Sequence, residues 1–268
     1  MSYTRVLMRV LSRIAIALLA PALCAADEAA ARLDDLGTRM QFDFYTADLG
    51  TLERDQASLA ALDVPAPLAA VKATFAGFGA WKRAELLSAT DPGKAGDAAR
   101  QCVLELDRAV ELEPKRAALH AMLSACQQRV AALQGRIKAP LAAGRAARSL
   151  EQAVQLSPRE PHVLLIEGLA GLDRERVGEA NVAAARKKLA AATVAFESAG
   201  QSSATDAFTV ALSWGPAEAW NALGQLELML GNRAAARDAF ERALVLVGDY
   251  REVQQRLKQV TGTASLAQ

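Results

Sequence analysis

The sequence has little of what catalysis at neutral pH requires. Its 268 residues include two histidines and three cysteines, whereas a catalytic site usually needs a histidine, an activated cysteine, paired carboxylates or a metal. It contains no glycine-rich phosphate-binding loop, no G-x-S-x-G motif and no cluster with the spacing of zinc ligands. These absences predict a protein that is not an enzyme and that carries no metal or other cofactor.

The sequence also lacks a concentration of charge and a long apolar run. Lys and Arg number 31 and Asp and Glu 30, and the two signs are interspersed along the chain. Nucleic-acid binding needs a basic face, so we expect no nucleic-acid partner. Beyond the N-terminal segment no apolar run reaches the roughly 20 residues that span a bilayer. We therefore expect no membrane span in the mature protein.

The N-terminal segment has the pattern of a secretory signal peptide. Three arginines by residue 13 precede the apolar run Ile14–Ala20, and small residues lead to Ala26 before an acidic boundary. A lipoprotein signal would need a small residue before Cys24, but Leu23 stands there. An uncleaved anchor would need about twice the apolar length. The pattern predicts cleavage after Ala26, a periplasmic or secreted location, and a mature chain with 28 basic and 30 acidic residues.

Composition and a recurring signature indicate a helical repeat. Alanine, the best helix former, is abundant, and little of the sequence alternates with a period of two, so we expect an all-α fold. The signature occurs at Leu106–Pro114, Leu150–Pro158, Phe196–Ala199 and Phe240–Leu246. Its aligned alanines, Ala109, Ala153, Ala199 and Ala243, are 44, 46 and 44 residues apart. The sequence therefore predicts helix pairs with an irregular period of about 44 residues.

The last repeat, Ala217–Leu246, has the clearest order of large and small residues. Its pattern positions are Trp220, Leu223, Gly224, Ala236, Phe240 and Ala243. This order resembles the tetratricopeptide repeat, a unit of about 34 residues in which two antiparallel helices cross at small side chains. The alternatives are an ordinary amphipathic hairpin and the HEAT or armadillo arrays, whose periods lie in the forties. The resemblance implies an α-solenoid whose helices nest at Gly224 and Ala236.

The expected organisation follows from these patterns. Residues 1–26 form the signal peptide, 27–90 an N-terminal helical cap, 91–262 the tetratricopeptide-like repeats with a C-terminal capping helix, and 263–268 a flexible tail. The helix that begins near Ala117 is expected to continue through Ile137. An aromatic stripe in the N-terminal segment, Phe75, Phe78 and Trp81, is either a docking patch or, as we prefer, a buried part of the cap. The connector from Gly200 to Ser213 has no assigned role.

The resemblance implies a concave groove, lined by the first helix of each pair, that binds a peptide or a partner helix. The groove positions carried over to this chain are Glu218, Asn221, Gln225, Leu228, Met229, His162, Leu165, Leu169, Gln128 and Arg129. The lysine and asparagine clamp that some tetratricopeptide co-chaperones use for a terminal carboxylate is not visible. We therefore expect a scaffold or assembly factor of the bacterial envelope that holds a protein or peptide partner. The alternative is a self-associating structural protein, a homodimer that joins through Phe208 and Trp214.

The remaining chemistry rests on two cysteines and two histidines. Cys102 and Cys126 are expected on neighbouring helices of the repeat, so they are a possible disulfide in an exported protein; the alternative is two small buried apolar residues. His120 aligns with Trp220 and is expected to pack in the core. His162 follows Pro161 and has no partner at ligand spacing in this interpretation. An enzyme of the envelope with a site built from scattered residues is the least favoured alternative.

Overall fold

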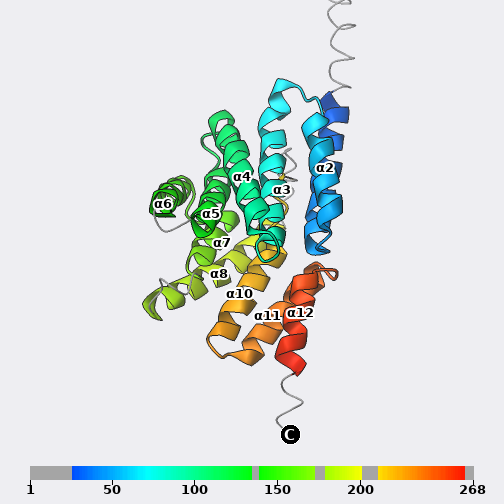
Figure 1. Ribbon diagram of the computed structural model, residues 1–268. Coiled ribbons are helices and arrows are strands. Elements are labelled where there is room, and N and C mark those ends of the chain that lie inside the picture. Colours follow the sequence, from blue (N-terminus) through cyan, green and yellow to red (C-terminus); the bar gives the residue numbers. More distant parts are fainter. Residues whose placement is uncertain (1–25, 135–138, 173–178, 201–210, 263–268) are drawn as a thin grey trace, which may run out of the picture.

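The computed structural model describes residues 26–134, 139–172, 179–200 and 211–262, and in these ranges the chain is all-helical, without strands (Figure 1). The first helix covers residues 26–45. The others are α2 (Leu49–Ala61), the 3-10 helix η1 (Ala66–Leu68), α3 (Ala69–Leu87), α4 (Pro92–Leu112), α5 (Ala117–Leu133), α6 (Ala139–Leu156), α7 (Pro161–Ala170), α8 (Glu179–Ala199), α10 (Pro216–Met229), α11 (Arg233–Leu246) and α12 (Arg251–Gly262). The all-α prediction is confirmed for this part of the chain. The predicted signal peptide, the tail and most of the connector lie outside it.

Neighbouring helices pack in pairs that follow the chain. The densest contacts join α3 to α4, α5 to α6, α7 to α8 and α10 to α11, and the pairs touch through α4 and α5, α5 and α7, and α8 and α10 (Figure 1). Helix α12 packs on α11. Short connections of this kind place consecutive helices antiparallel. Helix α3 belongs by its packing with α4, although the boundary expected near residue 90 falls between them.

Glycines allow close approach within three of these pairs. A Cβ on Gly77 would lie 2.6 Å from Leu106 Cγ, and one on Gly224 would lie 2.5 Å from Phe240 Cε1. In the α7–α8 pair a Cβ on Gly168 would lie 2.5 Å from a methyl carbon of Leu189. These distances are shorter than van der Waals contact, so a side chain at any of these positions would push the helices apart. In all three pairs, then, a glycine on the first helix packs against a large side chain on the second.

The third occurrence of the signature was assigned to the wrong turns of α8. Ala109, Ala153 and Ala243 have no exposed surface, whereas Ala199 is exposed. The fully buried alanine of α8 is Ala192, three residues after the Leu189 that faces the glycine of α7. Helix α8 extends two turns beyond this contact. Those turns contain Phe196 and Ala199, an aromatic and an alanine at the spacing of the signature, so the signature was matched to them instead.

Helix boundaries follow the local sequence with one correction. Helix α5 ends at Leu133, because its C-cap Gln134 has extended backbone angles, and it does not continue to Ile137 as expected. Pro140 lies in the first turn of α6, where the missing proline N–H is not needed. At other starts an acidic side chain caps the helix: Asp91 Oδ1 accepts from the Lys94 amide at 3.0 Å, as N-cap residues do.

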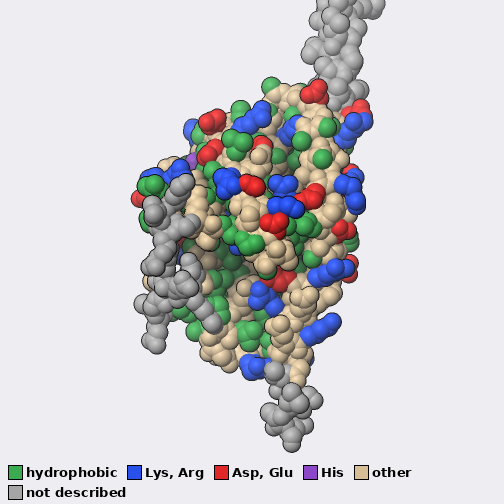
Figure 2. All heavy atoms as spheres, viewed as in Figure 1, with side chains coloured by type: hydrophobic (Ala, Val, Ile, Leu, Met, Phe, Trp, Pro, Cys, Tyr) green, Lys and Arg blue, Asp and Glu red, His purple; other side chains and the backbone are tan. Residues whose placement is uncertain are grey.

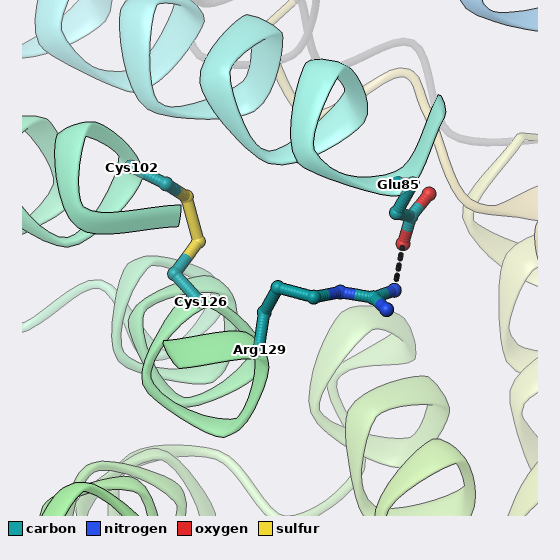
Figure 3. The surroundings of a disulfide bond; sticks show 4 residues. All are labelled: Glu85, Cys102, Cys126 and Arg129. Atoms are coloured by element: carbon teal, nitrogen blue, oxygen red, sulfur yellow. Dashed lines mark ion pairs between the residues drawn. A yellow bond between two sulfur atoms is a disulfide. The ribbon is translucent and has the colours of Figure 1, made fainter. Parts of the chain in front are cut away.

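A disulfide joins the second helix of one pair to the first helix of the next. Cys102 on α4 and Cys126 on α5 are bonded, with their Cα atoms 5.9 Å apart (Figure 3). Both residues are fully buried. The link fastens the α3–α4 pair covalently to the α5–α6 pair.

The C-terminal end of the first helix packs against the C-terminal helices. The rings of Tyr45 and Tyr250 are 4.8 Å apart and those of Phe44 and Tyr250 5.9 Å. These side chains share one buried cluster with Phe240 and Val253 of α11 and α12. The N-terminal segment was expected to cap the end of the array opposite the C-terminal helix, so this contact was not anticipated. It brings the C-terminal end of the first helix into contact with the last helices of the described chain.

Candidate functional site

A pocket of about 540 Å³ lies where the first helix, α3, α5, α7, α10 and α12 converge. Six of the ten expected groove positions line it, from three different helix pairs. They are Arg129, Leu165, Leu169, Glu218, Asn221 and Gln225. Helices rather than loops supply these side chains, which holds them in fixed relative positions.

The other four expected groove positions do not line the pocket. His162 is buried beneath it, and Leu228 packs into the cluster of Phe240 and Tyr250. Gln128 donates to Ser124 Oγ within α5 at 3.2 Å, and Met229 is half-buried at the last turn of α10. Sequence spacing placed them on the first helices of their pairs but could not fix which way each side chain points.

A buried lysine forms the electrostatic centre of the pocket floor. The Lys82 side chain is only 3% exposed, and its Nζ lies 3.2 Å from Glu85 Oε2 and 3.9 Å from Glu218 Oε1. The same Nζ sits 4.1 Å from the centre of the Trp81 ring and 4.2 Å from that of Phe44. Carboxylates and ring faces together replace the water that a buried ammonium loses.

Glu218 joins α10 to the first helix and to α3. It is the third residue of α10, and its Oε2 accepts from the Gly215 amide at 2.9 Å, which caps the helix, and from the Tyr45 hydroxyl at 2.9 Å. Burial and the charge of Glu218 raise the pKa of Tyr45 well above its usual value. The turn before α10 requires glycine because Gly215 has a φ of +116° and a Cβ there would lie 2.4 Å from the Phe196 ring. Glu218, expected as a groove position, thus lines the pocket and also caps its own helix.

Asn221, one turn further along α10, connects the floor to α12. Its Nδ2 donates to the Tyr250 hydroxyl and to Glu252 Oε2, both at 3.2 Å. Glu252 also pairs with Arg256 at 2.6 Å. Burial and the surrounding carboxylates, Glu218 first among them, raise the pKa of Tyr250 well above its usual value. Tyr250 therefore stays neutral and remains able to donate its own hydroxyl proton.

The rim of the pocket carries an ion pair between helix pairs. Arg129 of α5 reaches Glu85 at the end of α3, with 3.5 Å between Nη2 and Oε1 (Figure 3). Figure 3 also shows that Arg129 lies one turn from the disulfide at Cys126 on the same helix. Glu85 thus serves both the rim cation and the buried Lys82.

Aromatic residues are concentrated around this pocket, although they make up only 5% of the sequence. The five that line it are Phe44, Tyr45, Trp81, Trp214 and Tyr250. They come from four segments far apart in the chain, so no local spacing could reveal them. Trp81 belongs to the predicted stripe, which is buried throughout and so is no exposed docking patch. Trp214 is 2% exposed, which rules it out as a surface dimer contact, and Phe208 lies outside the described residues.

The burial of the two histidines is the reverse of what the sequence predicted. His120 is half-buried, with Nε2 2.9 Å from the Pro114 carbonyl oxygen. His162 is the buried one, with Nδ1 2.7 Å from Glu160 Oε1 and Nε2 3.0 Å from the Trp214 carbonyl oxygen. Burial tends to raise the pKa of Glu160, but its contacts with His162 outweigh this and lower it. Both ring nitrogens of His162 are occupied, so it has no free atom to offer a substrate.

The face of the molecule drawn in Figure 2 shows no concentration of charge of one sign. Figure 2 shows basic and acidic side chains interspersed over the face it displays. Among residues 26–134, 139–172, 179–200 and 211–262, no group of three or more His, Cys, Asp or Glu side chains could hold a metal, and none of the helices has the length and apolarity needed to cross a bilayer. No protein-family model and no curated protein matches the chain.

Proposed function

We propose that this chain is a tetratricopeptide-like α-solenoid, exported to the bacterial cell envelope, that acts as a non-catalytic scaffold for a protein or peptide partner. The observation that carries the proposal is the pocket, because six positions selected from the repeat pattern line a single recess. The glycine contacts within the α3–α4, α7–α8 and α10–α11 pairs support the repeat assignment. The basic and apolar N-terminal pattern supports export.

The composition of the pocket favours binding over catalysis. Its titratable groups are engaged in pairs, as in Lys82 with Glu85 and Arg129 with Glu85, whereas a general acid or base needs a free atom within reach of a substrate. The buried groups hold the walls in position, while Gln225, Leu169 and Arg129 are partly exposed. These three side chains are the ones a partner would contact first.

Affinity capture from the envelope extract of the host bacterium tests this function. The bait is the chain from residue 27 onward, and Gln225→Ala removes an amide that lines the pocket. Gln128→Ala is the matched control, since it makes the same chemical change on α5 outside the pocket. We expect the unaltered bait and the control to retain a partner that the Gln225 variant releases or holds more weakly. Equal recovery with both variants would contradict the use of this pocket, and recovery of no partner would contradict the scaffold function.

A further inference from the structure

Two buried aspartates, Asp43 and Asp55, form a carboxyl pair where the first helix is joined to α2. Asp43 lies in the last turn of the first helix and is 5% exposed, and Asp55 lies on α2 and is 1% exposed. Arg39, one turn before Asp43, donates from Nε to Asp55 Oδ2 at 2.9 Å, so Asp55 faces the side of the first helix that also carries Asp43. Asp48 lies in the turn between the two helices, and its Oδ1 accepts from the Thr51 amide at 3.0 Å. Three carboxyl groups therefore act on one another at this joint.

Asp43 has a buried oxygen, Oδ2, with no hydrogen-bond partner among the described residues. The neighbouring Asp55 and Asp48 side chains are acceptors when ionised, and both disfavour a negative charge on Asp43. Arg39 favours that charge, but its guanidinium already binds Asp55 and Asp35. A proton within the carboxyl pair supplies the missing donor and removes the repulsion between the two charges.

The electrostatics of Asp43 agree with a shared proton. Burial is the largest cause that raises its pKa, to about 6, followed by the charges of Asp55 and Asp48. A hydrogen bond between the side chains of the carboxyl pair raises this pKa further, while Arg39 lowers it. Because the pKa lies above its ordinary value of 3.8, the protonated joint is most stable in acid. That stability is lost as the pH rises from about 4 through about 6.

The joint adjoins one wall of the pocket. Asp43 is followed directly by Phe44 and Tyr45, which line the pocket and whose rings pack on Tyr250. Helix α2 packs on α3 and lies at the edge of the molecule (Figure 1), where local opening costs less free energy than in the interior. Repulsion at Asp43 is therefore relieved by movement of α2 and of this turn, without unfolding of the whole chain.

We propose that a proton held between Asp43 and Asp55 joins the first helix to α2, and that its loss loosens the turn that carries Phe44 and Tyr45. The wall of the pocket that these two rings form is then held less firmly above about pH 6 than below it. This device belongs to the fold and does not depend on the proposed scaffold function.

Amide hydrogen exchange of the chain from residue 27 onward, at about pH 4 and about pH 8, tests the proposal. Protection factors, corrected for the intrinsic effect of pH on exchange, are measured for residues 40–55 and for α5, a helix without carboxylates. We expect opening of residues 40–55 to increase by at most about 60-fold over this range, the ratio given by a pKa of 3.8 in the open state and about 6 in the closed state. At pH 8 these residues should be less protected than α5, because they open without the rest of the chain.

Two aspartate variants separate the carboxyl pair from other titrating groups. Asp43→Asn keeps the shape of the side chain and supplies a permanent donor toward Asp55, so its exchange should lose most of the pH dependence. Asp63→Asn makes the same change at an exposed position just after α2 and should exchange as the unaltered chain does. Circular dichroism of both variants verifies that they are folded.

A titration of the unaltered chain provides a measurement that needs no variant. The carboxyl carbon resonance of Asp43, followed by NMR, should change with a midpoint near pH 6. A midpoint near pH 4, the same pH dependence in Asp43→Asn as in the unaltered chain, or equal protection of residues 40–55 and α5 at pH 8 would each overturn the proposal.

Discussion

Removing the Cys102–Cys126 bond should destabilise the protein by an amount set by the loop it closes. The two cysteines are 24 residues apart, and the chain-entropy relation for a loop of that length gives about 3.5 kcal/mol at 25 °C. The bond lies between fully buried side chains on packed helices, so the native structure needs little rearrangement when it is cut. Most of the effect is then expected in the unfolded chain.

Urea denaturation of the chain from residue 27 onward measures this effect. That starting point excludes Cys24, so only the two buried cysteines can contribute thiols. We expect the reduced protein and a Cys102→Ala/Cys126→Ala double variant each to unfold at lower urea than the oxidised protein, by an amount equivalent to about 3.5 kcal/mol. The reduced protein retains both sulfur atoms and therefore controls for packing lost in the double variant.

Thiol titration supplies the independent check. The native, unreduced protein should show no thiol that reacts with a disulfide reagent after unfolding, and two after reduction. Two reactive thiols without reductant would refute the bond itself. Identical urea midpoints for oxidised and reduced protein, with the bond shown to be present, would refute the argument from loop entropy.

Three further changes test the packing and the charges. Burial, and then the nearby Asp55 and Asp48 carboxylates, raise the pKa of Asp43 from 3.8 to about 6, so its contribution to stability falls as the pH rises from about 4 to about 6. Asp43→Asn should abolish this loss and raise the free energy of unfolding, measured in urea at pH 7, by at most about 3 kcal/mol. A difference between the two proteins that does not change with pH would contradict the assignment. Gly224→Ala should cost about 1–3 kcal/mol through overpacking, while Gly262→Ala, which meets nothing within 4 Å, should be neutral; equal melting temperatures would contradict the close approach. Lys82→Met should cost about 3 kcal/mol by leaving carboxylates buried without their cation, and a variant as stable as the unaltered chain would show that the cation is dispensable.

The helices of this protein were predictable because their signals are local. The order of large and small residues over Ala217–Leu246 predicted a helix pair there, and the structure has α10 and α11 over Pro216–Met229 and Arg233–Leu246. Register was harder, since Ala192 and Ala199 both satisfy the same small-residue pattern in α8. Their burial and the nearby contact between Gly168 and Leu189 distinguish them, and both depend on how the two helices cross.

Part of the candidate site was predictable because the repeat pattern is also a local signal. Positions on the first helix of each pair, such as Asn221 and Leu165, follow from a repeat pattern. Phe44 and Lys82 were missed, because their place in the pocket depends on the first helix meeting the last. The contact between Glu160 and His162 was within reach of the sequence, since an acidic residue directly before Pro161 is well placed to cap a helix.

The meeting of Tyr45 with Tyr250 has a consequence for how the molecule is made. The first described helix cannot complete its packing until α11 and α12 have been synthesised, and contacts between such distant positions form slowly. Until then the aromatic end of that helix stays uncovered, a surface on which unfinished chains associate. A chain truncated before Tyr250 is therefore expected to aggregate or to need a chaperone, even though most of its helix pairs are intact.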